Sequence, residues 1–166
     1  ALTERLQEEL QFESRFCNAY MKAVELLERA EHSEGRLRTK LIQRRYPPAV
    51  VDSVICVLRE NNLLNNRRFA EHWVEVRLIR HPEGRTALIA GLIKRGVDRY
   101  TAESVVNENV TENREMESLV KAGEKLSLRH RGEYTKVSRA LLRRGFPSVK
   151  VRYFIDNNIK NGKNKA

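Results

Sequence analysis

Apolar residues recur in this chain with helical spacing, and the same helical pattern returns three times. Each copy holds a pair of adjacent aliphatic residues, then two polar or basic residues, then a bulky apolar residue a little further on. The aliphatic pairs are Leu41–Ile42, Leu92–Ile93 and Leu141–Leu142, and their first members stand 51 and 49 residues apart. Spacing of this kind indicates amphipathic helices, and a period near fifty residues indicates a tandem array of helical units. Such arrays usually present an extended surface rather than enclose a catalytic cleft.

The pattern predicts an all-α fold of three tandem three-helix repeats in an elongated array, with an extra helical extension at the amino terminus. Residues 3–30 read either as one long helix or as two helices with a break near residues 12–14. The predicted divisions are an extension at 1–15, repeats at 16–62, 63–110 and 111–160, and a basic tail at 161–166.

Helix starts can be placed from residues that favour the first turn. A side-chain oxygen just before a helix can accept a hydrogen bond from an otherwise unpaired N–H, and proline tolerates the first turn because its missing N–H had no partner there. The expected starts are Ser33, Pro47–Pro48, Asn65 or Asn66, Asp98, Thr111 or Asn113, and Pro147–Ser148.

Positive charge follows the repeats rather than the extension. The 166 residues carry a formal net charge of +10, and residues 1–30 hold four bases against six acids. Residues 31–62 hold six bases against four acids, residues 63–96 seven against three, and residues 97–166 fifteen against nine. This distribution favours an anionic partner, either nucleic acid or an acidic protein surface. The alternative is that the charge only keeps the chain soluble.

A pair of basic residues ends each predicted middle helix, at Arg44–Arg45, Lys94–Arg95 and Arg143–Arg144. These basic doublets have two explanations. Cations near a helix carboxyl end complement the helix dipole and stabilise it by a few tenths to about 1 kcal/mol each. Alternatively, stacked repeats would set the doublets in a row that binds a periodic polyanion. The candidate partner- or phosphate-binding residues are Arg44, Arg45, Arg67, Arg68, Arg77, Arg80, Arg85, Lys94, Arg95, Arg139, Arg143 and Arg144.

No catalytic, cofactor-binding or metal-binding motif stands out in the sequence, so we expect a binding protein rather than an enzyme. Acidic groups such as Glu112, Glu115 and Glu117 read as parts of solvated, mixed-charge helix faces. Trp73 reads as a core or inter-repeat packing residue, whereas exposed tyrosines could stack on bases. Nothing resembles a helix placed to read base edges, so any DNA contact should be independent of sequence.

Three of the four histidines recur with the repeats, and the chain has two cysteines. His32, His81 and His130 are spaced by 49 residues at the predicted ends of the first helices, where we expect them to cap carbonyl groups. Cys17 and Cys56 are expected to be buried or half-buried reduced thiols, which fits the cytoplasm. No run of apolar residues is long enough to cross a bilayer, and the first ten residues do not follow the order of a signal peptide.

Several phrases of the sequence together resemble the RecX family. The stretch Glu28–Leu41, with its Arg-Ala-Glu-His-Ser order, and the stretch Leu63–Val74, with its Arg-Arg-Phe-Ala order, look like two phrases of that family. The segments Leu88–Val97 and Ala140–Phe146 fit its later copies, and the match spans about residues 17–159 in the family's order. Two departures stand out. Asn65–Asn66 replaces an acidic pair, and Arg45 stands where the other repeats have glycine.

The resemblance implies a regulator of the RecA recombinase, built as a curved, elongated monomer of three three-helix repeats. Proteins similar to it bind the RecA filament along its helical groove and inhibit ATP hydrolysis, coprotease activity and strand exchange. The partners would be the RecA filament and, without sequence preference, DNA phosphates. An autonomous nucleic-acid-binding protein remains the alternative, and a pure protein scaffold is a weaker third possibility.

Overall fold

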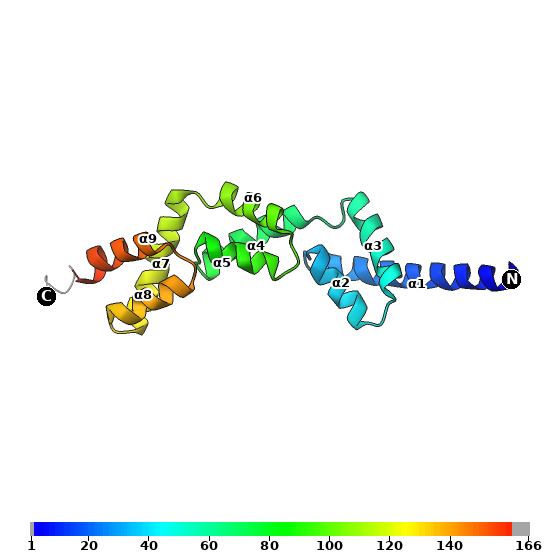
Figure 1. The fold of residues 1–166 in the computed structure, drawn as a ribbon, viewed down its shortest axis with the longest axis horizontal. Helices are drawn as coiled ribbons and strands as arrows, with labels where there is room; N and C mark the ends of the chain where they lie inside the picture. Colours follow the sequence, from blue (N-terminus) through cyan, green and yellow to red (C-terminus); the bar gives the residue numbers. More distant parts are fainter. Residues whose placement is uncertain (1, 161–166) are drawn as a thin grey trace. The chain divides into compact units, whose positions relative to one another are not determined.

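The computed structural model describes residues 2–160, and over that range it is helical without strands (Figure 1). The predicted all-α repeat fold is confirmed, whereas the predicted basic tail at 161–166 lies outside the described residues. The helices are α1 (Leu2–Arg29), α2 (Glu34–Gln43), α3 (Pro48–Glu60), α4 (Asn66–Arg80), α5 (Arg85–Ile93), α6 (Arg99–Asn109), α7 (Glu112–Arg129), α8 (Tyr134–Arg143), α9 (Ser148–Phe154) and the π-helix η1 (Ile155–Lys160).

The helix starts agree with the predicted ones, and the structure decides between the alternatives that the sequence left at the starts of α4 and α7. Ser33, Asp98 and Thr111 accept hydrogen bonds from the backbone N–H groups three residues ahead, as helix-capping side chains do. Asn65, rather than Asn66, caps α4, since its side-chain oxygen lies 3.0 Å from the amide nitrogen of Arg68. The long segment before the first turn is one helix, α1, without a break.

The chain divides into two compact units. The first unit comprises residues 1–69 together with Arg95–Val97, and the second comprises residues 70–94 and 98–166. In the first unit α1 packs against α2 and α3, and the core gathers small residues of α1 and aliphatic residues of the other two helices. Its fully buried members include Ala19, Ala23, Leu37, Leu41, Val51, Val54 and Leu58.

The amino-terminal half of α1 extends beyond this core. Every side chain from residue 3 to residue 15 is exposed, so the predicted extension is a continuation of α1 and not a separate packed element. The large exposed apolar residues of this part are Leu6, Leu10 and Phe12.

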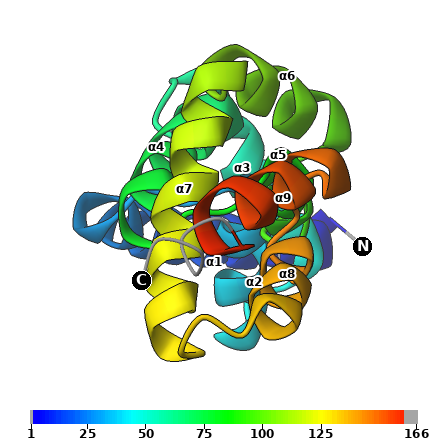
Figure 2. The ribbon, with the colours of Figure 1, turned by 90° about the vertical axis from the view of Figure 1, so that its left-hand side faces the viewer.

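The second unit holds α4 from residue 70 onward, together with α5 to α9 and η1. Figure 2 shows α8 and α9 beside α7, and these three helices share a core built from residues such as Leu119, Leu141 and Phe154. Helix α5 packs against α6 in the same unit, where Leu88, Leu92 and Val105 are fully buried. Trp73 is half-buried and lies against Gly91 of α5, which agrees with its predicted packing role.

The expectation for the cysteines was partly wrong. Cys56 is half-buried as expected, but Cys17 is exposed on the surface of α1. The face of α1 that packs on the core contains Phe16, Ala19 and Ala23. Cys17 lies outside this face and therefore points to solvent. Across residues 2–160, none of the helices combines the length and the apolar content that a membrane span requires.

Candidate partner-binding surface

The basic doublets stand at turns with a shared backbone geometry. After α2, α5 and α8 the chain enters the left-handed region at Arg45, Gly96 and Gly145, with φ values of 65°, 80° and 78°. After α2 and α8 the turn is closed by a hydrogen bond from the amide just past the left-handed residue: the Tyr46 amide donates to the Leu41 carbonyl, and the Phe146 amide donates to the Leu141 carbonyl. This is the usual way a helix ends with its last carbonyl groups satisfied.

Two of these turns pack tightly against the start of another middle helix. In the second unit the amide of Gly84, just before α5, donates to the carbonyl of Arg144 at 2.9 Å. A Cβ on Gly145 would lie 2.5 Å from the amide nitrogen of Ala87. In the first unit the Ser33 hydroxyl, just before α2, donates to the carbonyl of Arg95. Next to Arg95, a Cβ on Gly96 would lie 2.6 Å from the Cα atom of Gly35, so neither Gly96 nor Gly145 has room for a side chain.

These contacts fix the distance between neighbouring doublets within each unit. In the first unit α2, of ten residues, begins at the Arg95 carbonyl and ends at Arg44. In the second unit α5, of nine residues, begins at the Arg144 carbonyl and ends at Lys94. At a rise of about 1.5 Å per residue, each pair of doublets is separated by roughly 15 Å along one middle helix.

Most of the doublet side chains face solvent. Arg44, Arg45, Lys94 and Arg143 are exposed, and Arg95 and Arg144 are half-buried. The Arg44 guanidinium donates to the Lys40 carbonyl at 2.8 Å, which is the helix-end interaction of the first explanation. Because these side chains are exposed, they are also accessible to an anionic partner, as the second explanation requires.

Three of the predicted binding residues form ion pairs within the protein. Arg68 of α4 pairs with Glu31 at 2.6 Å in the first unit. Arg77 pairs with Glu83 at 2.7 Å and lies 5.6 Å from the ring centre of Trp73.

Arg85 is the third of these residues. Its side chain donates to the Val110 carbonyl at 2.9 Å and approaches Glu112 to 3.7 Å. The charges of Arg68, Arg77 and Arg85 are therefore largely compensated inside the molecule.

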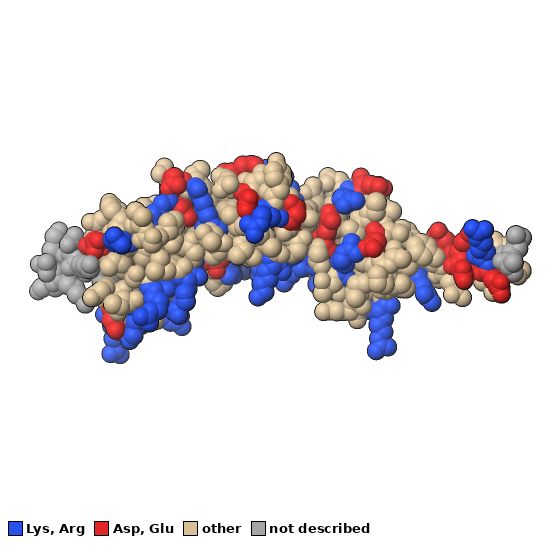
Figure 3. Space-filling view, viewed as in Figure 1, with Lys and Arg blue, Asp and Glu red and all other residues tan. Residues whose placement is uncertain are grey.

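The remaining predicted residues, Arg67, Arg80 and Arg139, are exposed. Arg139 belongs to a group of cations on the outer side of α8, which we call the α8 basic surface and define as Lys136, Arg139 and Arg143. Figure 3 shows this gathering of Lys and Arg side chains over α8, at the lower left of the view. Lys136 pairs with Glu133 at 2.7 Å, whereas neither arginine forms an ion pair with any residue of the described range 2–160.

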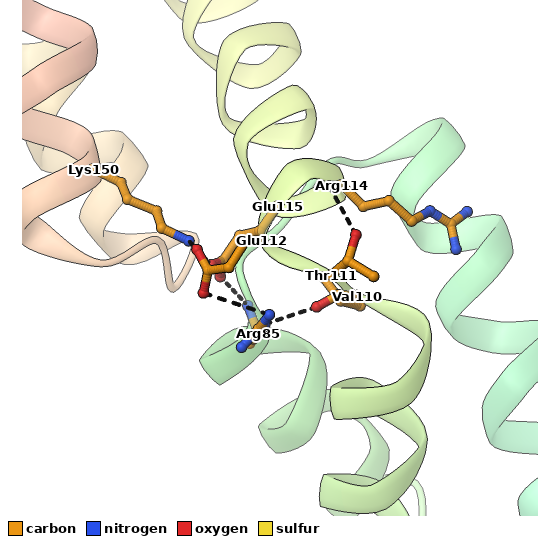
Figure 4. A network of polar contacts seen from close by, with 7 residues as sticks. All are labelled: Arg85, Val110, Thr111, Glu112, Arg114, Glu115 and Lys150. Carbon is orange, nitrogen blue, oxygen red and sulfur yellow. Dashed lines mark hydrogen bonds and ion pairs between the residues drawn. The ribbon is translucent and has the colours of Figure 1, made fainter.

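A buried polar network lies at the start of α7, and the sequence reasoning missed it (Figure 4). Glu115 was expected on a solvated face, but it is only 1% exposed. Its carboxylate accepts hydrogen bonds from the Lys150 ammonium at 2.5 Å and from the Arg85 amide at 3.1 Å. The signal was present in the sequence: Glu115 lies four residues before Leu119, on the stripe that faces the core.

The same network shifts two pKa values. Lys150 also pairs with Glu112, and this hydrogen bond and charge hold the pKa of Glu112 below its usual value. Burial alone would lower the pKa of Lys150, but the hydrogen bonds and charges of Glu112 and Glu115 outweigh burial and raise it. The network thus joins the start of α5, the first turn of α7 and α9 within the second unit.

The three histidines occupy different environments. His81 directly follows α4 and is exposed, and His130 directly follows α7, where its amide donates to the Leu126 carbonyl. His32 lies three residues after the end of α1 and is buried, with its Nε2 atom 3.2 Å from the Lys40 ammonium. Burial, followed by the charges of Lys40 and Arg36, lowers the pKa of His32.

Comparison with known proteins finds two matching three-helix domains. The family model for the first three-helix domain of RecX matches residues 19–56, and the model for the second three-helix domain matches residues 65–106. The regulatory protein RecX of Treponema pallidum (strain Nichols) is 36% identical over 141 residues, which cover 85% of each chain. That of Halorhodospira halophila is 34% identical over 137 residues, covering 78% of this chain and 81% of the relative.

Two solved structures share the fold. A crystal structure of a regulatory protein RecX superposes with a TM-score of 0.82 at 20% identity, covering 93% of this chain and 78% of the other. The crystal structure of RecX from Lactobacillus salivarius superposes with a TM-score of 0.75 at 22% identity, covering 86% of this chain and 96% of the other. With the helical pattern, the two matching domain models and relatives of this similarity, the chain belongs to the RecX family of regulatory proteins.

Proposed function

We propose that this protein modulates the RecA recombinase by binding along the groove of the RecA–DNA filament, where it limits ATP hydrolysis and strand exchange. The RecA partner follows from the family resemblance. The observation that carries the proposal is the repeated placement of exposed basic turns, with roughly one middle helix, about 15 Å, between neighbours in each unit. Regularly spaced cations suit a partner that is itself a repeating polymer.

The physical basis is multivalent attraction. A single exposed charge pair contributes only about 0–1 kcal/mol, which is too little for a regulator acting at low concentration. Contacts joined in one chain act at a high effective concentration, so several weak contacts together give useful affinity. We propose that a monomer bound in this way, in the cytoplasm, occupies space that incoming duplex DNA needs.

The test is inhibition of the DNA-dependent ATPase of RecA by a triple variant, Arg44→Glu, Lys94→Glu and Arg143→Glu. One exposed cation is reversed in each doublet, so the packed residues Arg95 and Arg144 stay intact. A loss of about 0.5 kcal/mol at each of the three positions sums to about 1.5 kcal/mol, and about 1.4 kcal/mol is a factor of ten, so the half-inhibitory concentration should rise about tenfold or more.

The matched control reverses two exposed arginines outside the doublets, Arg59 of α3 and Arg99 of α6. This control should inhibit RecA as the unmodified protein does. If the triple variant inhibits equally well, the doublets are not the contact surface.

An autonomous, sequence-nonspecific nucleic-acid-binding protein is the second candidate, and the exposed α8 basic surface favours it. A salt titration on bare DNA separates the two functions. Binding to phosphates releases counterions, so a site neutralising about six phosphates loses on the order of a thousandfold in affinity as salt rises fourfold. Tight binding to bare DNA at physiological salt would support the second function, and weak binding there supports a RecA-dependent regulator.

A further inference from the structure

A groove runs between α8 and the α9–η1 segment of the second unit, beside Arg143 of the third basic doublet. Its volume is about 250 Å³. One wall consists of three residues one helical turn apart on α8, Tyr134, Ser138 and Leu142. The opposite side is formed by Val151 and Arg152 of α9 and by Ile155 of η1.

The lining combines apolar surface with an accessible aromatic ring. Val151 and Ile155 are buried and form an apolar floor, while 49% of Tyr134 and 46% of Leu142 remain exposed. Pockets for drug-sized molecules measure about 300–1,000 Å³. A groove slightly below that range suits a smaller flat group, such as one nucleobase.

The rim of the groove is strongly basic. Arg139 and Arg143 directly follow Ser138 and Leu142, so they lie about 100° further round α8, toward solvent. Both are exposed, as is Arg152, and within residues 2–160 the structure pairs none of the three with a carboxylate. A ligand whose flat group enters the groove would therefore meet positive charge on its flanks.

We propose that this groove binds one base of single-stranded DNA, with Tyr134 stacking on the base and Arg139, Arg143 and Arg152 contacting the neighbouring phosphates. The inference deepens the proposed function, because it assigns the DNA of the filament a site on this chain. Single-strand sites commonly combine a basic track with aromatic stacking. A duplex keeps its bases stacked inside, so the groove selects single strands.

The polar groups at the groove fit a base better than a second anion. The Ser138 hydroxyl can donate or accept, and the Asp156 carboxylate at the end of the groove can accept a hydrogen bond from an exocyclic amino group. A carboxylate there would repel a phosphate or an acidic side chain. An acidic peptide is therefore the less suitable occupant.

The test measures binding of the full chain to an oligonucleotide of about twelve nucleotides, within the range of single-strand site sizes, at low salt and without RecA. A 2-aminopurine in the oligonucleotide reports stacking through its fluorescence. Tyr134→Ala should weaken binding about fivefold to a hundredfold, the range measured for one lost base–aromatic stack, and should abolish the stacking signal. Binding to an abasic oligonucleotide of the same length and charge should not change.

Tyr153→Ala is the matched control, since Tyr153 is 62% exposed on α9 but does not line the groove. Ser138→Trp is a second variant that fills the groove from α8 and should have the same effect as Tyr134→Ala, so the proposal stays testable if one variant fails to fold.

Three results would overturn the proposal: unchanged affinity in both groove variants, an equal loss on the abasic oligonucleotide, or displacement of DNA by polyglutamate that depends on Tyr134. Failure here is distinguishable from failure of the proposed function, because RecA is absent from this assay and the doublets are unchanged.

Discussion

Glu115 shows how one residue can tie three helices together. A carboxylate removed from water is strongly destabilising unless a cation and further hydrogen bonds compensate it. In this protein Lys150 supplies the cation and the Arg85 amide supplies the hydrogen bond. Lys150 is thus a structural cation, in contrast to the exposed arginines of α8.

Removing this cation should destabilise the second unit. Lys150→Met removes the cation that faces the buried Glu115 side chain, and loss of one partner of a buried pair costs about 3–5 kcal/mol. Urea denaturation should show a decrease of about that size in the free energy of unfolding, and adding Glu115→Gln should recover part of it. Lys136→Met, at an exposed ion pair, should change the free energy by less than about 1 kcal/mol. A Lys150→Met protein as stable as the original would show that the pair does not support the fold.

His32 should make the first unit sensitive to mild acid. The unfolded chain has an ordinary histidine pKa near about 6.5, whereas burial and the charges of Lys40 and Arg36 lower the folded value. Below the ordinary value the unfolded chain takes up a proton that the folded chain resists. The free energy of unfolding of the first unit is therefore highest above about pH 6.5, and it decreases as the pH drops toward the folded pKa of His32.

The measurement is the urea midpoint between pH 7.5 and about pH 5. The midpoint of the unmodified protein should fall more steeply than that of His32→Gln. His81→Gln, at an exposed histidine, should follow the unmodified protein. Equal slopes in all three proteins would contradict the account.

At the scale of elements, the end of each middle helix explains a departure in the sequence. Gly96 and Gly145 have positive φ, and each lies so close to another backbone segment that a Cβ has no room. Arg45 has the same positive φ, and its side chain is exposed to solvent. The first repeat can therefore use arginine because its turn needs only the left-handed backbone, not a close contact.

Substitutions at the two kinds of turn should differ in their effect. Gly145→Ala places a Cβ 2.7 Å from the Cβ of Ala87 and strains the backbone, so we expect a loss of more than about 2 kcal/mol in the free energy of unfolding. Arg45→Gly relieves the left-handed strain and should be neutral or stabilising, by up to about 1 kcal/mol. Thermal denaturation of both variants tests the contrast, and similar losses in the two would refute it.

Element-level features were the easiest to predict from the sequence. Helix starts depend on a capping residue and its next few neighbours, and Ser33, Asp98 and Thr111 act as expected. The ion pairs were harder, because Arg68 meets Glu31, 37 residues away, and Lys150 meets Glu115, 35 residues away. A local sequence pattern does not show which cations form ion pairs within the protein, because the partners are brought together only by tertiary packing.

At the scale of the whole molecule, the period near fifty residues predicted the repeat fold, and the charge distribution predicted basic repeats. Sequence alone did not distinguish cations that support the fold from cations that face solvent. Of the predicted binding residues, the exposed ones are Arg44, Arg45, Arg67, Arg80, Lys94, Arg139 and Arg143, and their contact with a partner stays a prediction.

The most direct measurement is therefore an electron cryomicroscopy reconstruction of this protein on a RecA–DNA filament. The account predicts that each copy follows the helical groove, with the turns at 44–45, 94–95 and 143–144 facing the filament. Density on the outer surface of the filament with these turns facing solvent, or density only at filament ends, would contradict it.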